Sequence, residues 1–160
     1  MDFKHVPVML DEVISGLGIK EDGCYVDCTV GGGGHSKEIL KRLSNKGHLY
    51  AFDRDADAIA HCKEKFKGYE NITLIHANFK DAPSILREMD ISHIDGFLID
   101  LGVSSYQIDN ANRGFSINHD GKLDMRMDKT QKLTAKKVVN TYSEEKLANI
   151  IYEYGEERFS

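Results

Sequence analysis

The stretch VDCTVGGGGHS, residues 26–36, decides how this chain folds. It joins a β-branched run to four consecutive glycines and then to a histidine where helical spacing begins. A glycine-rich turn between a strand and the next helix lets a ligand approach the backbone and directs helix N-terminal amides at it. Because a tight turn needs fewer than four glycines, the stretch favours a nucleotide or nucleoside ligand over a merely flexible connection.

Strand and helix patterns alternate around this turn. Strand patterns cover residues 23–30, 48–53, 72–77 and 94–103, and helical patterns cover residues 36–47, 56–66 and 82–89. A lead-in helix is predicted over residues 7–17 with Pro7 in its first turn, and Asp55 is predicted to cap the helix that begins at residue 56. This alternation implies βαβ crossovers and a parallel sheet covered on both faces, so the predicted fold class is α/β.

Composition and charge argue against a secreted protein, a membrane protein and a protein that binds nucleic acid through its whole surface. The chain has 160 residues, of which 41% are hydrophobic and 29% charged, enough to bury one core. It shows neither a secretory signal nor a membrane span, so a cytoplasmic protein without a membrane partner is expected. A net charge of -5 argues against binding nucleic acid through the whole surface but permits a local basic patch. The three cysteines include no CxxC pair and are predicted to be reduced core thiols. No metal is expected.

Three positions narrow the ligand class. Asp53 ends the second strand about twenty residues beyond Gly33, where a carboxylate can accept hydrogen bonds from both ribose hydroxyls. A dinucleotide fingerprint would place a third glycine at Ser36, which favours S-adenosyl-L-methionine over NAD. Asn78 and Phe79, after the third strand, suit an adenine.

Asp100 follows the apolar run of the fourth strand and should emerge at the carboxyl edge of the sheet, facing the site. A carboxylate there could balance a sulfonium charge, hold the methionine amino group or take a proton from an acceptor amine. The following segment, residues 104–128, is rich in Asn, Asp, Gly and Ser, and connections of that length are usually functional. Helices are predicted over residues 134–140 and 143–159.

A set of motifs resembles, in order and spacing, the RsmH (formerly MraW) family, which methylates the exocyclic N4 of a cytidine in small-subunit ribosomal RNA. They are HVPVMLDEV, DCTVGGGGHS, FDRDADAI, DGFLIDLGVSSYQID, RGFS, LDMRMD and YGEERF, between residues 5 and 159. The resemblance implies a Rossmann-like S-adenosylmethionine-dependent methyltransferase sheet. Residues 1–110 would form the N-terminal part of its core and residues 111–160 the start of a helical insertion. Family members are longer, so the chain is expected to be a fragment or one part of a divided protein.

Position by position, the resemblance implies a site for S-adenosyl-L-methionine. Its methionine end would contact Gly33, Gly34 and His35, its ribose Asp53 and its adenine side Phe79, with Asp100 and Gln107 completing the set. His35 is expected to act through its backbone, and a role as a helix-start residue is an equal alternative.

The predicted catalytic residues are Asp100 and Asp109, because an acceptor for the N4 protons should help a nitrogen whose lone pair is delocalised into the ring. Asp109 is equally explained as a turn residue. Contacts with the small ribosomal subunit RNA are assigned to Arg113, Phe115 and Arg126, because single-stranded RNA is read by aromatic stacking and arginine contacts. Phe115 could instead anchor the loop in the core.

Two other functions stay open at this point. The chain could be a truncated cofactor-binding module without catalytic activity of its own. It could also be an NAD-linked oxidoreductase, which Ser36 and the lack of a YxxxK motif disfavour. Because a sheet that ends at the fourth strand leaves an edge able to pair with other chains, a homo-oligomer through that edge is expected.

Overall fold

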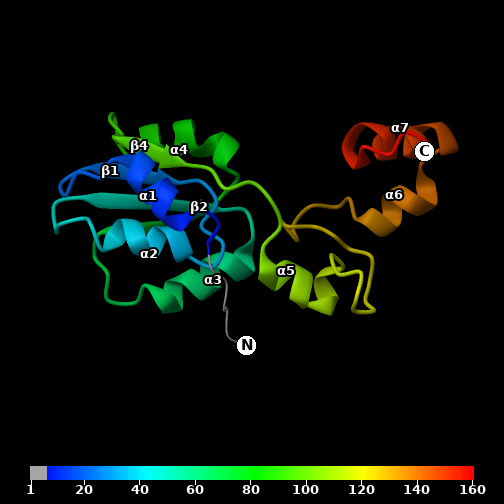
Figure 1. Ribbon diagram of the computed structural model, residues 1–160, viewed down its shortest axis with the longest axis horizontal. Helices are drawn as coiled ribbons and strands as arrows, with labels where there is room; N and C mark the ends of the chain where they lie inside the picture. Colours follow the sequence, from blue (N-terminus) through cyan, green and yellow to red (C-terminus); the bar gives the residue numbers. More distant parts are fainter. Residues whose placement is uncertain (1–6) are drawn as a thin grey trace. The chain divides into compact units, whose positions relative to one another are not determined.

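The computed structural model describes residues 7–160, and the chain divides between Tyr106 and Gln107 into two compact units. The first unit holds a parallel sheet of four strands in the order β3-β2-β1-β4 (Figure 1). The strands are β1 (Cys24–Asp27), β2 (His48–Asp53), β3 (Ile72–His76) and β4 (Gly96–Leu98). The predicted parallel α/β class is confirmed, and the division lies a few residues before the predicted domain boundary at residue 110.

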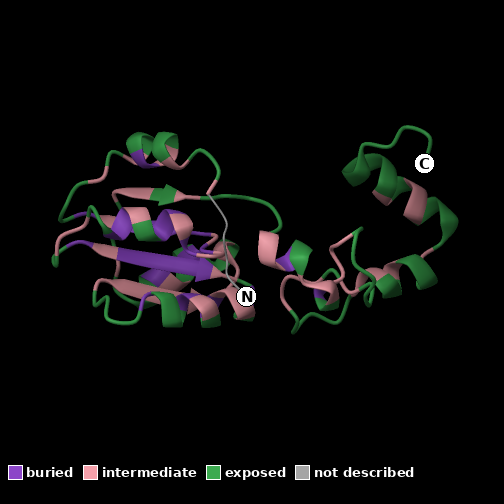
Figure 2. Cartoon of the chain, turned by 60° about the horizontal axis from the view of Figure 1, so that its bottom comes forward, coloured by how far each residue is buried: buried purple, intermediate pink, exposed green. Residues whose placement is uncertain are grey.

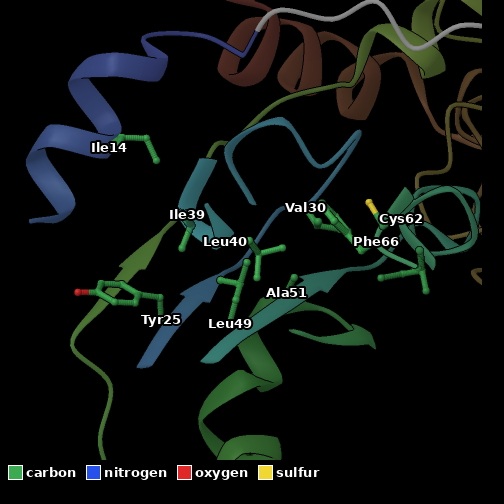
Figure 3. Packing of buried hydrophobic residues seen from close by; sticks show 10 residues of the cluster. Ile14, Tyr25, Val30, Ile39, Leu40, Leu49, Ala51, Cys62 and Phe66 are labelled. Atoms are coloured by element: carbon green, nitrogen blue, oxygen red, sulfur yellow. The ribbon is translucent and has the colours of Figure 1, made fainter. Parts of the chain in front are cut away.

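Helices cover both faces of this sheet. They are α1 (Leu10–Leu17), α2 (Gly34–Leu40), α3 (Ala56–Lys65) and α4 (Ala82–Glu88). Side chains of a strand alternate between the two faces, so Leu49 and Ala51 enter the cluster under the first three helices (Figure 3). Tyr50 and Phe52 enter the second cluster, under α4. β2, central in the sheet, therefore carries side chains of both cores.

The strand order reverses between β1 and β4. These two strands are paired in parallel, although two further strands separate them in the sequence. In open α/β sheets ligands bind in the crevice outside the carboxyl ends of the strands at such a reversal. Asp27 pairs with Leu98 at this end of the two strands. The reversal therefore places the glycine turn after β1 beside the segment that follows β4.

The helices α1 and α2 differ in extent from the predicted helices. α1 begins at Leu10, because Met9 before it takes a left-handed conformation (φ 48°), and Pro7 precedes the helix instead of lying in its first turn. The helix predicted over residues 36–47 ends at Leu40. Beyond it, the Ser44 amide donates to the carbonyl of Glu21, which turns the chain back toward the start of the sheet.

The fourth strand is shorter than the apolar run that predicted it. β4 spans Gly96–Leu98, and beside it Phe97 is 60% and Leu101 71% exposed. β4 pairs with β1 alone, so its outer edge carries no further strand among the described residues. The homo-oligomer expected through this edge stays a prediction.

The second unit consists of short helices and a long irregular loop. Its elements are η2 (Ala111–Arg113), α6 (Ala135–Thr141) and α7 (Glu144–Gly155), while α5 (Ser105–Asp109) crosses the division. α7 ends at Gly155 because Glu156 is left-handed (φ 54°). Figure 2 shows buried residues concentrated in the sheet unit. No helix within residues 7–160 combines the length and the apolarity needed to cross a membrane. The first two residues of the motif HVPVMLDEV lie outside the described part of the chain.

Candidate functional site

The conformation and the packing of the turn between β1 and α2 require glycine at several positions. Gly31 (φ 49°) and Gly33 (φ 69°) take left-handed conformations that residues with a side chain rarely adopt. A Cβ on Gly33 would lie 2.8 Å from the Phe66 ring, and one on Gly34 would overlap Cγ of Pro7. From the sequence we expected the surplus glycines to make room for a ligand. That explanation is incomplete, because three of the four already serve the turn and its packing.

Asp53 connects β2 to this turn. Its Oδ2 accepts a hydrogen bond from the Gly31 amide and its Oδ1 one from the Asp55 amide, both at 2.9 Å. Burial raises the pKa of the Asp53 carboxyl, although these two amides act in the opposite direction. Each carboxylate oxygen has a second lone pair, so Asp53 can hold the turn and still accept hydrogen bonds from a ligand's hydroxyls.

The Asp55 prediction is confirmed, and it separates the two acidic residues after β2. Asp55 is buried, and its side chain accepts a hydrogen bond from the Asp57 amide as the N-cap of α3. Of the pair, Asp53 is the one whose carboxylate lies against the glycine turn.

A buried pair that the sequence analysis did not select lies under the turn. The Ser36 hydroxyl donates to Oδ2 of Asp27 at 2.6 Å, and the Thr29 amide donates to Oδ1 at 3.0 Å. Asp27 and Ser36 are 1% and 0% exposed, and burial raises the pKa of Asp27 while the Ser36 hydrogen bond opposes it. The pair ties the end of β1 to the first turn of α2. An aspartate within the apolar run 23–30, followed by a serine where a glycine was expected, was the available signal.

Asp100 and His35 lie together at the reversal of strand order. The Asp100 amide donates to the Thr29 hydroxyl at 2.8 Å, which joins the end of β4 to the turn after β1. The Asp100 carboxylate is 40% exposed, and its Oδ2 lies 4.0 Å from Nδ1 of the buried His35. Because the Val8 carbonyl, 3.0 Å from Nε2, can only accept, Nε2 carries a hydrogen and Nδ1 is the nitrogen toward Asp100. His35 thus has a side-chain role in addition to the predicted backbone contact.

Phe79 lies beyond β3, in the short helix η1 (Phe79–Asp81), and packs against the second core cluster. The Asn78 side chain accepts a hydrogen bond from the Lys80 amide and so caps η1. The ring of Phe79 is only partly buried. Its predicted contact with an adenine stays a prediction, as does that of Asn78.

The remaining predicted site residues belong to the second unit. Gln107 is buried and Asp109 exposed in α5, and their predicted roles toward the cofactor and the acceptor stay predictions. Phe115 is partly buried in the loop that follows η2.

Both arginines predicted to contact RNA hold the loop of the second unit. Arg113 is 3% exposed, and its Nη2 donates to the carbonyls of Arg126 and Met127 at 3.0 and 3.1 Å. Arg126 binds both carboxylate oxygens of Asp124 at 2.7 Å, and its Nη1 donates to the carbonyls of Lys129 and Gln131. The structure therefore gives both guanidinium groups a role in shaping the chain that the sequence analysis did not anticipate.

The cysteines are not chemically activated. Burial raises the pKa of Cys62 to about 12 and that of Cys28 to about 11, so both stay thiols at neutral pH. The Cys62 thiol donates to the Gly31 carbonyl at 3.4 Å and helps to hold the turn. Within residues 7–160, His, Cys, Asp and Glu side chains form no group of three or more that could hold a metal ion.

Comparison with known proteins identifies a family. A model of the MraW methylase family matches residues 2–160. Two curated proteins of Clostridium botulinum, each named ribosomal RNA small subunit methyltransferase H, are similar over 160 residues. The protein of strain Kyoto / Type A2 is 58% identical and that of strain 657 / Type Ba4 57%, over 100% of this chain and 52% of theirs. The chain therefore spans about half the length of the curated relatives it matches.

Two solved structures are similar to part of the chain. A putative rRNA methylase from Clostridium thermocellum covers 50% of this chain and 48% of its own, at 21% identity and a TM-score of 0.45. A SAM dependent methyltransferase from Aquifex aeolicus covers 44% of this chain and 38% of its own, at 24% identity and a TM-score of 0.40.

Proposed function

Because this chain belongs to the MraW methylase family, we propose that it forms the S-adenosyl-L-methionine site of an enzyme that methylates the exocyclic N4 of a cytidine in small-subunit ribosomal RNA. The observation that carries the proposal is the meeting of the glycine turn, Asp53 and Asp100 at the carboxyl edge of the sheet. The names of the relatives supply the substrate class.

The side chains at this edge match the chemistry of the cofactor. Asp53 offers acceptor lone pairs for two ribose hydroxyls, and Phe79 offers an apolar ring for the adenine side. The backbone of Gly33, Gly34 and His35 would meet the methionine end, and the Asp100 carboxylate would attract its amino group. The family resemblance adds Gln107 to the proposed cofactor contacts.

When bound, S-adenosyl-L-methionine supplies an electrophilic methyl group. The chain contributes a proton acceptor and a fixed geometry. The cytosine N4 is a poor nucleophile, so a carboxylate that accepts its proton assists the reaction. Asp100 is the first choice because its carboxylate is 40% exposed at the site, and Asp109 is the second. Positioning of the acceptor and exclusion of water would supply the rest of the rate enhancement.

The RNA must present an unstacked base to such a site. In this proposal Phe115, which is only partly buried, stacks against a base. Arg113 and Arg126 shape the loop that carries it, through their hydrogen bonds to backbone carbonyls.

A second candidate is a cofactor-binding module that catalyses nothing alone. It is favoured by the outer edge of β4, which pairs with no further strand among residues 7–160 and beside which Phe97 is 60% exposed. The NAD-linked oxidoreductase gains no support, because the position of the missing third glycine is filled by the buried Ser36 hydroxyl.

Isothermal titration with S-adenosylhomocysteine tests the cofactor site. The parent chain should bind saturably and Asp53→Ala should lose binding. Asp53→Asn, which keeps an oxygen for the Gly31 amide, should bind more weakly than the parent. Asp90→Asn is the matched control, because Asp90 is exposed and follows α4, before β4 begins. A folded parent chain that fails to bind would contradict the proposal.

A methylation assay on small-subunit RNA then separates the two candidates. Methyl transfer by the parent that Asp100→Asn abolishes, even at an S-adenosyl-L-methionine concentration that saturates the variant, would support the enzyme. Binding without methyl transfer by the parent would favour the cofactor-binding module.

A further inference from the structure

We propose that residues 122–137 form a preorganised surface of lysines that binds the phosphate backbone of single-stranded RNA. The identity of the nucleic acid rests on the proposed function, whereas the surface itself rests on charge and structure. It adds a second electrostatic contact with RNA to the one predicted for Arg113 and Arg126.

The charge of this segment is opposite to that of the rest of the chain. Residues 122–137 contain six basic and two acidic residues, whereas the other residues contain fifteen basic and twenty-four acidic ones. Arg126 and Asp124 neutralise each other in a two-point ion pair at 2.7 Å. The charges that remain in the segment are five lysines and Asp128, so it is a positively charged segment on an otherwise acidic protein.

Backbone hydrogen bonds gather these lysines into one folded segment. The Lys136 amide donates to the Leu123 carbonyl at 2.8 Å, which brings the start of α6 beside Lys122. The Ala135 amide donates to the Asp124 carbonyl at 2.9 Å. Arg126 also holds the carbonyls of Lys129 and Gln131. The exposed lysines of the segment are Lys122, Lys129, Lys132, Lys136 and Lys137.

Two of these lysines lie where helix electrostatics disfavour a positive charge. Lys136 and Lys137 lie in the first turn of α6, where no acidic residue accompanies them and where the helix dipole disfavours a cation. In α7 the first two positions hold Glu144 and Glu145, as helix electrostatics favour.

Apolar side chains lie between the lysines. Leu123 is 42% and Met125 46% exposed, and Met125 holds a left-handed conformation (φ 58°) in the hydrogen-bonded loop. Single strands expose their bases as well as their phosphates, so a surface with both kinds of side chain suits a single strand better than a duplex.

The test is the salt dependence of binding to a short fluorescently labelled single-stranded RNA, followed by anisotropy between about 50 and about 200 mM salt. A variant with Lys132→Gln, Lys136→Gln and Lys137→Gln should bind more weakly. Its slope of log affinity against log salt should be smaller in magnitude by about 2, since each phosphate contact on a single strand contributes about 0.7.

The matched control removes three charges elsewhere, with Lys46→Gln, Lys63→Gln and Lys67→Gln, all exposed in the sheet unit. It should keep the parent's slope. Equal losses in both variants would show that only net charge matters, and an unchanged slope in the first variant, or no RNA binding by the parent, would likewise overturn the proposal.

Titration of the same variants with S-adenosylhomocysteine distinguishes the two proposals. Normal cofactor binding with an unchanged RNA slope would reject the lysine surface alone. Failure of the parent to bind S-adenosylhomocysteine would reject the proposed cofactor site, whatever the RNA measurement shows.

Discussion

The sheet unit buries its hydrophobic side chains in two clusters, whereas residues 107–160 bury polar groups. In the first unit Ile39, Leu49 and Phe52 are 0% exposed. Among the described residues of the second unit, the buried ones are Gln107 and Arg113, and α6 and α7 bury no residue. Hydrophobic burial therefore holds one unit together, and hydrogen bonds from side chains to carbonyls shape the other.

This difference predicts unequal resistance to unfolding. Burial of apolar area is the main term that offsets the conformational entropy of the chain. A hydrogen bond adds about 0.5–1.5 kcal/mol but fixes a local geometry precisely. The sheet unit should therefore open at the higher free energy, and the second unit should open first.

The largest contrast should come from two phenylalanines. Phe52→Ala empties a fully buried site and should lower the free energy of unfolding by about 3–5 kcal/mol. Phe159→Ala makes the same chemical change at a side chain that is 97% exposed and should change it by less than about 0.5 kcal/mol. Urea unfolding followed by circular dichroism measures both, and equal costs would refute the comparison.

The glycine turn tests the contribution of close packing. Gly33→Ala and Gly31→Ala both place a side chain at positive φ, which costs about 1–2 kcal/mol. Only Gly33→Ala adds a Cβ 2.8 Å from Phe66, so it should cost about 1–3 kcal/mol more. The same unfolding experiment measures the difference, and two equal values would mean that the Phe66 ring moves aside freely.

Arg113 tests the polar unit. Arg113→Lys keeps the charge but cannot reproduce the planar donors that meet the carbonyls of Arg126 and Met127, so local opening should become easier by about 1.5–3 kcal/mol. Amide exchange at Met125, whose amide donates to the Arg113 carbonyl, measures it. The urea midpoint of the sheet unit should not move, and a parallel fall of both would contradict separate stabilities.

Acid titration should give the smallest effect. The hydrogen bond from Lys20 holds the pKa of Asp95 at about 2, below the value of about 3.9 for an unfolded chain. The stability that this carboxylate contributes is therefore complete above about pH 4 and is lost as the pH falls toward 2. Asp95→Asn should reduce the change in the thermal unfolding midpoint of the sheet unit between about pH 4 and pH 2. An unchanged pH profile would show that Asp95 is not responsible.

Asp124 provides the counterpart in the second unit. A hydrogen bond from Arg126 lowers the pKa of Asp124, so its contribution is likewise present above its unfolded pKa and lost in acid. Asp124→Asn should alter amide exchange at Lys136 and leave the thermal midpoint of the sheet unit unchanged.

Local sequence patterns predicted the elements well where neighbours in the chain decide them. β2 matches its predicted range, and Asp55 caps α3 because the cap needs only the amide of Asp57, two residues away. Where a contact with a residue distant in the sequence determines the local structure, the sequence predicted less of it. Gly33 needs room for Phe66, and no local pattern shows that contact.

The same distinction between local and distant residues applies to the candidate functional site. The parallel α/β class, the family and the position of Asp53 at a strand end could be predicted from residue patterns alone, because periodicity and motif spacing are written along the chain. Tertiary structure decided that Ser36 holds Asp27, that Thr29 holds the Asp100 amide, and that Arg113 supports a loop. These are directional hydrogen bonds between groups that come together only when the chain folds, so their partners cannot be identified from spacing along the sequence.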